Sequence, residues 1–269
     1  MALVLKQIAT PDVPLEADNI TPARFTGQTP AGVEKLAVMH GSESRRIGDF
    51  FSVSGQFDGT INLEGDHLGR VKLIGAGMSR GVIQVDGDVG EHLGAAMSGG
   101  EIRVNGNATD WVGPEMSGGR IEIHGNAGHM VGSAYRGAAM GMTGGEIIIH
   151  GNARNEAGNA MRNGVIAIGG NSGDFTGVNM LSGSIFVLGE LGIRTGAGMK
   201  RGSIVSMKET TLLPTFSYSC TYRPGYMTLY LLHLSQIFAV AEEYIEGSYK
   251  RYCGDSVELN RGEVLLYAG

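Results

Sequence analysis

Few side chains in this 269-residue chain could carry chemistry, and two histidines come first. His124 and His150 each follow a run of alternating residues and precede a Gly-Asn pair, so they occupy equivalent positions in two copies of a repeat. If the copies stack, the imidazoles lie together and could bind a metal ion. Two histidines without a carboxylate or thiol in a matching position make an incomplete site. We therefore expect an outward polar ladder here and predict no metal ligands.

The other candidates for chemistry are weaker. Cys220 and Cys253 have no C-x-x-C partner and no nearby histidine, which favours inert thiols, and two cysteines give no disulfide framework. Residues 75–81 and 196–202 are rich in glycine but lack the Lys-Ser/Thr ending of a phosphate-binding loop. No combination of nucleophile, base and oxyanion donors is recognisable, so we predict no catalytic residue and no cofactor-binding residue.

Apart from the two cysteines, these residues lie within a sequence that repeats itself. Methionine recurs at steps of 19 residues with one step of 26, and three glycine columns keep the same spacing. The methionines are Met78, Met97, Met116, Met142, Met161, Met180 and Met199. A fixed period near 20 residues is typical of a solenoid. Hexapeptide acyltransferase solenoids step by six, and 19 is not a multiple of six, so that class is disfavoured. A calcium-binding β-roll needs an aspartate column after paired glycines, and we expect Asp86, Asp88, Asp110 and Asp174 to share no such column.

Each repeat contains one short strand. Residues 102–105 alternate apolar and polar side chains, which is typical of a half-buried strand, and successive repeats place isoleucine or valine at the two inward positions. Stacking buries these side chains, each worth about 1.5–3 kcal/mol. Four asparagines follow a column glycine and are expected to form a ladder that begins at Asp88 and ends at Glu190. They are Asn107, Asn126, Asn152 and Asn171.

The period also divides the chain. We expect N-terminal strands and irregular capping coils over residues 1–74, regular coils over 75–209, and a C-terminal covering segment over 210–269. The prolines of the first 50 residues predict turns and extended pieces. In the last part, residues 235–245 predict a short helix with Ser235 as a candidate N-cap, whereas 226–234 fit a strand or a helix.

The 26-residue step predicts a loop at residues 133–141, because seven residues are inserted at one corner of the coil. Loops at one corner of a solenoid often form its binding side. Tyr135 and Arg136 in this loop could contact a small ligand, but contact with a partner protein is the preferred interpretation.

The outward strand positions change from polar in the early repeats to apolar in the late ones. Five apolar side chains would be exposed on a bare stack: Ile148, Phe186, Leu188, Val205 and Met207. Proteins rarely leave such a patch open. Either the C-terminal segment folds over it or another subunit docks there. We favour the first, because residues 226–244 are themselves apolar and need a surface to pack on.

Composition excludes several classes of partner. The net charge is −6 and no basic stripe is present, so nucleic acid is not an expected partner. No apolar run approaches the ~20 residues of a membrane helix. The first residues lack a basic region followed by a long apolar run, so we expect a cytoplasmic protein.

The repeat resembles a known family. Residues 97–107 read Met-Ser-Gly-Gly-Glu-Ile-Arg-Val-Asn-Gly-Asn, and 116–126 and 142–152 repeat the pattern. This is similar to the GXGXG motif family, which includes the C-terminal domain of glutamate synthase and the C subunit of formylmethanofuran dehydrogenase. Chain length, the loop at 132–142 and the segments 212–216 and 222–224 resemble the C subunit, and more narrowly that of the bacterial formyltransferase/hydrolase complex.

The resemblance implies a right-handed parallel β-helix inside a multi-subunit complex. In the bacterial complex a formyl group passes from tetrahydromethanopterin to methylofuran and is released as formate, during formaldehyde oxidation in one-carbon metabolism. The archaeal dehydrogenase instead fixes carbon dioxide as formylmethanofuran, with a molybdenum or tungsten pterin. In both, the reacting groups lie on other subunits, so the resemblance implies a non-catalytic scaffold without a cofactor of its own.

Three alternatives stay open. The chain could be the C subunit of an archaeal-type dehydrogenase complex. It could be an enzyme with its own site at the 133–141 loop and the His124/His150 column. It could also be a spacer like that of glutamate synthase, although no amidotransferase or flavin region accompanies it.

Overall fold

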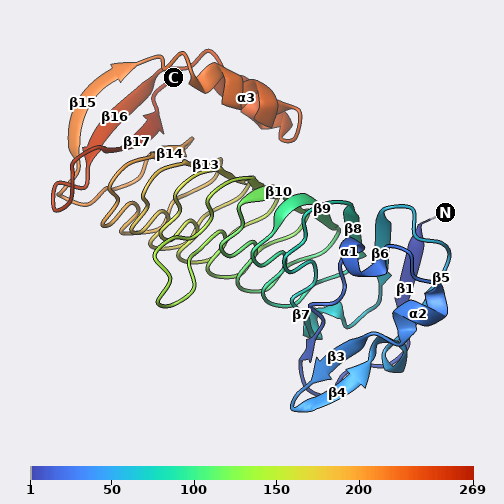
Figure 1. The fold of residues 1–269 in the computed structure, drawn as a ribbon. Helices are drawn as coiled ribbons and strands as arrows, with labels where there is room; N and C mark the ends of the chain where they lie inside the picture. The colour runs from blue at the N-terminus through green and yellow to red at the C-terminus, as the bar shows by residue number, and fades with distance from the viewer. Residues whose placement is uncertain (1) are drawn as a thin grey trace.

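The chain forms an elongated stack of coils with a cover at one end (Figure 1). A computed structural model describes residues 2–269. The fold is mostly β, with one thirteen-stranded sheet and one four-stranded sheet. None of the helices in the described residues has the length and apolar character that crossing a membrane requires.

The elements follow in chain order. They are β1 (Leu3–Gln7), β2 (Leu15–Glu16), α1 (Pro22–Phe25), α2 (Pro30–Glu34), β3 (Ala37–His40), β4 (Glu43–Arg46), η1 (Ile47–Asp49), β5 (Phe51–Ser54), β6 (Thr60–Glu64), η2 (Leu68–Arg70), β7 (Val71–Lys72), β8 (Val82–Asp86), β9 (Ser98–Val104), β10 (Gly118–Ile123), β11 (Glu146–Ile149), β12 (Val165–Ile168), β13 (Ser184–Val187), β14 (Ser203–Ser206), β15 (Ser217–Tyr222), α3 (Met227–Ser235), η3 (Ala239–Tyr244), β16 (Tyr249–Gly254) and β17 (Gly262–Tyr267).

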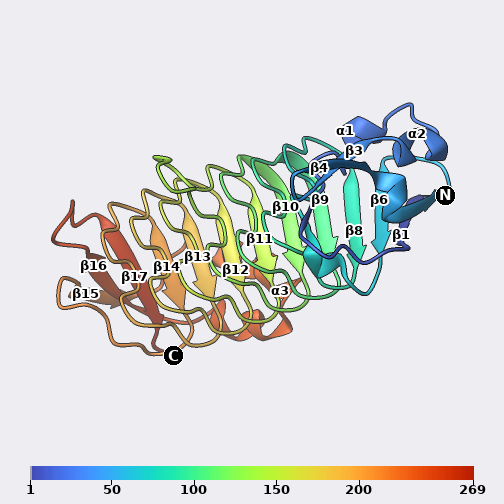
Figure 2. The same ribbon diagram turned by 90° about the horizontal axis from the view of Figure 1, so that it is seen from below.

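The large sheet runs along the whole stack, as its row of strands shows (Figure 2). Its order is β15-β16-β17-β14-β13-β12-β11-β10-β9-β8-β6-β1-β5. Within this order, each strand in the run from β17 to β1 is parallel to its neighbours in that run. The end strands are antiparallel: β5 to β1, β16 to β17, and β15 to β16. The smaller sheet has the order β4-β3-β2-β7.

The pairing register places like residues of successive repeats side by side. Ile102 of β9 pairs with Ile121 of β10, which pairs with Ile147 of β11. This confirms the predicted axial columns. The inward isoleucines and valines of β8 to β13 and the methionine column are buried, and they form one continuous core.

One glycine column is required by the close approach of the next coil. Gly113 has φ +59°, and a Cβ added there would lie 2.7 Å from Cδ1 of Ile147. Only glycine tolerates both the positive φ and the lack of space for a Cβ, which explains why glycine recurs at this position in every repeat.

A second corner adopts the left-handed backbone without glycine. Its residues are Leu73, His92, Trp111, Met130, Glu156, Phe175 and Arg194, with φ between 59° and 65°. Non-glycine residues seldom adopt this conformation, so their spacing did not suggest it. Inter-coil hydrogen bonds hold the corner: the backbone N of His92 donates to Asp110 O at 3.1 Å, and that of Trp111 to His129 O at 2.8 Å.

The predicted asparagine ladder is present. Oδ1 of Asn107 accepts from the backbone N and Nδ2 of Asn126, at 2.8 and 3.1 Å, and Asn126 does the same for Asn152. Asp88 begins the ladder, and the backbone N of Glu190 ends it.

A second ladder corrects the prediction for the aspartates. Asp110 and Asp174 do share a column once the seven inserted residues are removed. Oδ1 of Asp110 accepts from the backbone N of His129 at 2.7 Å, and Oδ1 of Asp174 accepts from that of Ile193 at 3.0 Å. These carboxylates bond to the backbone of the next coil, as the asparagines do.

The N-terminal prolines do not all break the chain. Pro22 and Pro30 begin the short helices α1 and α2, and Oγ1 of Thr29 accepts from the backbone N of Gly32 at 3.1 Å. Proline is well suited to the first helical position, where its missing N–H has no partner to lose. The Thr-Pro pairs were the local signal for these helices.

The C-terminal helix lies earlier than predicted. The prediction of a helix at 235–245 holds only for residues 239–244, which form the 3-10 helix η3, whereas the α-helix α3 ends at Ser235, which is therefore not an N-cap. In α3, Met227, Leu231 and Leu234 are buried on one face. Spacings of four and three residues suit an α-helix. Ala241 and Tyr244, three apart, suit the tighter turn.

Candidate functional site

The insertion loop is anchored at Tyr135. Its hydroxyl lies 2.9 Å from Nδ1 of His92, and its ring stacks on Trp111 with centroids 4.8 Å apart. His92 and Trp111 both belong to the left-handed corner of the two earlier coils. The loop therefore packs back against the stack at its base, while Arg136 is exposed.

The electrostatics of this anchor are those of neutral groups. Burial raises the pKa of Tyr135 to about 12, with a contribution from Glu115. Burial also lowers the pKa of His92. The phenol and the imidazole are thus both uncharged at neutral pH, and they share one hydrogen bond. This pair stabilises the loop and supplies neither an ionised base nor an activated nucleophile.

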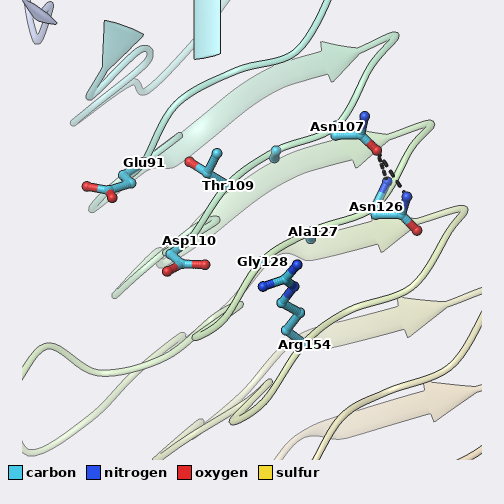
Figure 3. A pocket seen from close by; sticks show the side chains of 9 residues that line it. Glu91, Asn107, Thr109, Asp110, Asn126, Ala127, Gly128 and Arg154 are labelled. Carbon is cyan, nitrogen blue, oxygen red and sulfur yellow. Dashed lines mark hydrogen bonds between the residues drawn. The ribbon is translucent and has the colours of Figure 1, made fainter. Parts of the chain in front are cut away.

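Two shallow cavities lie on the outside of the coils. One, of about 500 Å³, is lined by Trp111, Tyr135, Arg136, Glu156 and Asn159 among others. The other, of about 590 Å³, has Asn107 and Asn126 at one edge and Glu91 and Asp110 at the opposite edge, with Arg154 nearby (Figure 3). The lining of this second cavity includes members of both ladders: Asn107 and Asn126 of the asparagine ladder, and Asp110 of the aspartate ladder. In each of the three, side-chain Oδ1 already accepts a hydrogen bond from a backbone N–H of the next coil.

His124 and His150 lie beside a carboxylate, that of Glu122, which is not in their column of the repeat. Their rings lie edge to face with centroids 4.9 Å apart. Oε1 of Glu122 lies 2.9 Å from Nε2 of His150 and 3.7 Å from Nε2 of His124. In the described chain these three residues are the one group of three potential ligands that gathers closely enough to hold a metal ion.

Glu122 was recognisable from the alternation of the strand. It precedes His124 by two residues in the β10 strand and its extension, so both side chains leave the same face. Glu122 lies in a different outward column from His124 and His150, so the repeat spacing alone does not pair it with them. In the strand pairing Glu122 lies opposite Ile148, and its side chain reaches diagonally to His150, two residues further along the next coil.

A network of charges surrounds Glu122. Its Oε2 accepts from Arg120 at 3.1 Å, and the same guanidinium contacts Glu146 at 3.2 Å. Burial alone would raise the pKa of Glu122, but the hydrogen bonds from His150 and Arg120 and their charges lower it below its ordinary value. The carboxylate is therefore ionised at neutral pH.

The apolar outward face is covered by the C-terminal segment. Ile148, Phe186, Leu188, Val205 and Met207 are all buried, in one cluster with residues of α3, η3, β16 and β17. Phe186 is 1% exposed. In this structure none of the five offers a free surface to a partner.

Polar contacts fix the edges of this cover. Within the cover, the hydroxyl of Tyr226 donates to Glu263 Oε1 at 2.8 Å. Between the cover and the stack, His233 Nε2 lies 2.6 Å from Glu146 Oε1 on β11. Phe238 packs on the ring of His150, with centroids 5.2 Å apart. The cover thus ends where the outward columns become polar.

The two cysteines are not part of the group formed by Glu122, His124 and His150. Cys220 and Cys253 are half-buried free thiols on β15 and β16, whose pairing places Cys220 opposite Arg251 and Cys253 opposite Ser217.

Comparison with known proteins identifies related chains. The model of the GXGXG motif family matches residues 68–217. The C subunit of the tungsten-containing formylmethanofuran dehydrogenase 2 from Methanothermobacter thermautotrophicus is 40% identical over 92 residues, which cover 32% of this chain and 34% of the relative. The C subunit of the formyltransferase/hydrolase complex Fhc from Methylorubrum extorquens is 36% identical over 84 residues, 30% of this chain and 31% of the relative. The matched region thus spans about a third of the length of these curated relatives.

A structural comparison extends over the full length. A chain in the crystal structure of the formyltransferase/hydrolase complex FhcABCD from Methylorubrum extorquens, determined in complex with methylofuran, superposes with a TM-score of 0.89. It is 33% identical in sequence, and the match covers 99% of this chain and 100% of that chain.

Proposed function

Because this chain belongs to the GXGXG motif family, together with the C subunits of formylmethanofuran dehydrogenase, we propose that it is a non-catalytic scaffold subunit of a formyltransferase/hydrolase complex. The observation that carries the proposal is the match to a chain of FhcABCD over 99% of this sequence. The resemblance predicted from the repeat is confirmed.

The reaction we assign to the complex is the transfer of a formyl group from tetrahydromethanopterin to methylofuran, followed by release of formate. The related complex was crystallised with methylofuran, which supports methylofuran as the acceptor. Tetrahydromethanopterin as the donor is part of the proposal. The reacting groups and these cofactors would be held by the partner subunits, and this chain would position those subunits.

We extend the proposal to the architecture. The coils form a right-handed parallel β-helix over residues 75–209, capped by residues 1–74 and covered by 210–269. Parallel pairing at the repeat spacing supports the helix, and isolated parallel bridges such as Ala108 to Ala127 support its continuation around the coil. A cytoplasmic location goes with this role.

The partner contact we propose is the insertion loop. Tyr135 holds the loop against the stack, and Arg136 lies exposed beside it, so a rigid base presents an exposed cation. An acidic surface of a partner subunit is the matching chemistry. Arg136→Glu should weaken co-purification of the partners, whereas the charge reversal Arg24→Glu, at an exposed position of α1, should not.

The test of the scaffold role is native purification of the chain from its own cells, with mass spectrometry of the proteins that accompany it. We expect the other subunits of a formyltransferase/hydrolase complex at fixed stoichiometry. The isolated chain should turn over neither formyl-tetrahydromethanopterin nor formylmethanofuran. Turnover by the isolated chain would overturn the scaffold role and favour an enzyme with a site at the 133–141 loop.

The second candidate is the C subunit of an archaeal-type molybdenum or tungsten dehydrogenase, which the 40% identity to the tungsten enzyme favours. That match covers a third of this chain, whereas the match to FhcABCD covers nearly all of it. Co-purification of subunits containing a metal pterin and iron–sulfur clusters would select the dehydrogenase.

A further inference from the structure

Three side chains at the edge of the C-terminal cover have the composition of a zinc site. Glu122, His124 and His150 each offer one donor atom, and these atoms all lie within 4.8 Å of one another. Zinc–ligand bonds are about 2.0–2.2 Å, so the donors of a tetrahedral site are about 3.3 Å apart. The two distances to Oε1 of Glu122, 2.9 and 3.7 Å, bracket that separation.

The backbone holds the three residues in place. The N–H of His124 donates to Val104 O and that of His150 to Ile123 O, both at 2.9 Å, which continues the parallel pairing of the sheet. Glu122 lies within β10 itself. A site carried by paired strands needs only side-chain rotation to close on an ion.

Neighbouring groups orient the donors. Arg120 binds Oε2 of Glu122 at 3.1 Å, which leaves Oε1 directed at both imidazoles. Phe238 packs against the ring of His150. Outer contacts of this kind fix ligand orientation in metal sites. The positive charge of Arg120 would oppose a cation, but Glu146 at 3.2 Å and Glu101 at 3.8 Å offset it.

The donor set selects the ion. Two imidazoles and one carboxylate suit Zn²⁺, whereas Mg²⁺ and Ca²⁺ prefer oxygen ligands. The His124 side chain is 47% exposed, so an ion can enter from solvent and a water can complete the tetrahedron. We propose that Glu122, His124 and His150 bind one Zn²⁺ ion at this position. The site is independent of the scaffold role, since it is built from this chain alone.

The experiment measures zinc bound by the untagged, full-length chain after treatment with a chelator. Equilibrium dialysis against Zn²⁺ with elemental analysis should give one zinc per chain. His124→Asn and His150→Asn should each weaken binding by more than about 100-fold, beyond the loss typical of outer-shell changes. His67→Asn removes an exposed histidine that lies before the first regular coil, outside the proposed site, and should leave zinc binding unchanged.

A second readout separates loss of a ligand from loss of fold. Zinc should raise the melting temperature of the wild-type chain and of His67→Asn, but not that of His124→Asn, because only an ion that binds the folded state stabilises it. Glu122→Gln, which keeps the shape of the side chain, should behave as His124→Asn does. The proposal is overturned if the wild-type chain binds no zinc at micromolar concentrations, or if it binds zinc equally well after both histidine substitutions.

Discussion

The ring of Phe186 on β13 lies 5.2 Å from the ring of Tyr230 on α3, centroid to centroid, and this contact joins the stack to its cover. The two residues are 44 positions apart, more than two steps of the 19-residue repeat. Through such contacts the last sixty residues bury an outward face that a bare solenoid would expose to water.

Removing the Phe186 ring should therefore destabilise the chain strongly. Phe186→Ala is expected to lower the free energy of unfolding by about 3–5 kcal/mol, because a fully buried aromatic side chain leaves a cavity. Urea unfolding followed by circular dichroism measures the change. Leu229→Ala is the matched control: Leu229 lies on the same helix α3 but is 73% exposed, and its loss should change stability by less than about 0.5 kcal/mol. Equal effects of the two substitutions would contradict the covering role of α3.

The asparagine ladder should contribute measurable stability. Asn126→Ala leaves the backbone N–H of Asn152 without the oxygen that accepts it at 2.8 Å, and the expected cost is about 1–2 kcal/mol. Asn105→Ala, at an exposed position beyond the end of β9, should be close to neutral. Chemical denaturation of both variants makes the comparison. A neutral Asn126→Ala would show that water replaces the ladder without loss.

The close approach of successive coils can be tested at Gly113. A Cβ there would lie 2.7 Å from Ile147 Cδ1 on a backbone with φ +59°, so Gly113→Ala should cost more than about 1 kcal/mol. Gly69→Ala is the control, because a Cβ at Gly69 meets nothing within 4 Å and φ there is not in the left-handed region. Melting temperatures of the two variants should differ clearly, and a stable Gly113→Ala chain would argue against the tight corner.

Glu122 should make stability depend on pH in the acid range. Its pKa in the folded chain lies below the ordinary value of 4.5, so the unfolded chain binds a proton more readily. The stabilisation is present above pH 4.5 and is lost as pH falls through the lower folded pKa. The stability difference between wild type and Glu122→Gln should therefore shrink with acidification below that value. Denaturant unfolding with a chelator present measures this difference, and one that stays constant down to pH 3 would refute the assignment.

The sequence by itself determined the stack of coils. The 19-residue step of methionine, glycine and isoleucine predicted which residues share a column, and Ile102, Ile121 and Ile147 pair accordingly. It also located the asparagine ladder and the insertion at 133–141. These features depend on the repeat spacing alone, because each coil packs on the one before it and local periodicity carries over into space.

Only the tertiary structure decided what meets across columns and across distant segments. The position of α3 follows from the apolar face that it covers, and the sequence of residues 226–245 is compatible with a helix in either half. Glu122 joins His124 and His150 because neighbouring strands bring two different columns together. Tyr135 reaches His92 because the inserted loop folds back over two coils. Such contacts depend on side-chain direction and long-range packing, which the repeat spacing does not encode.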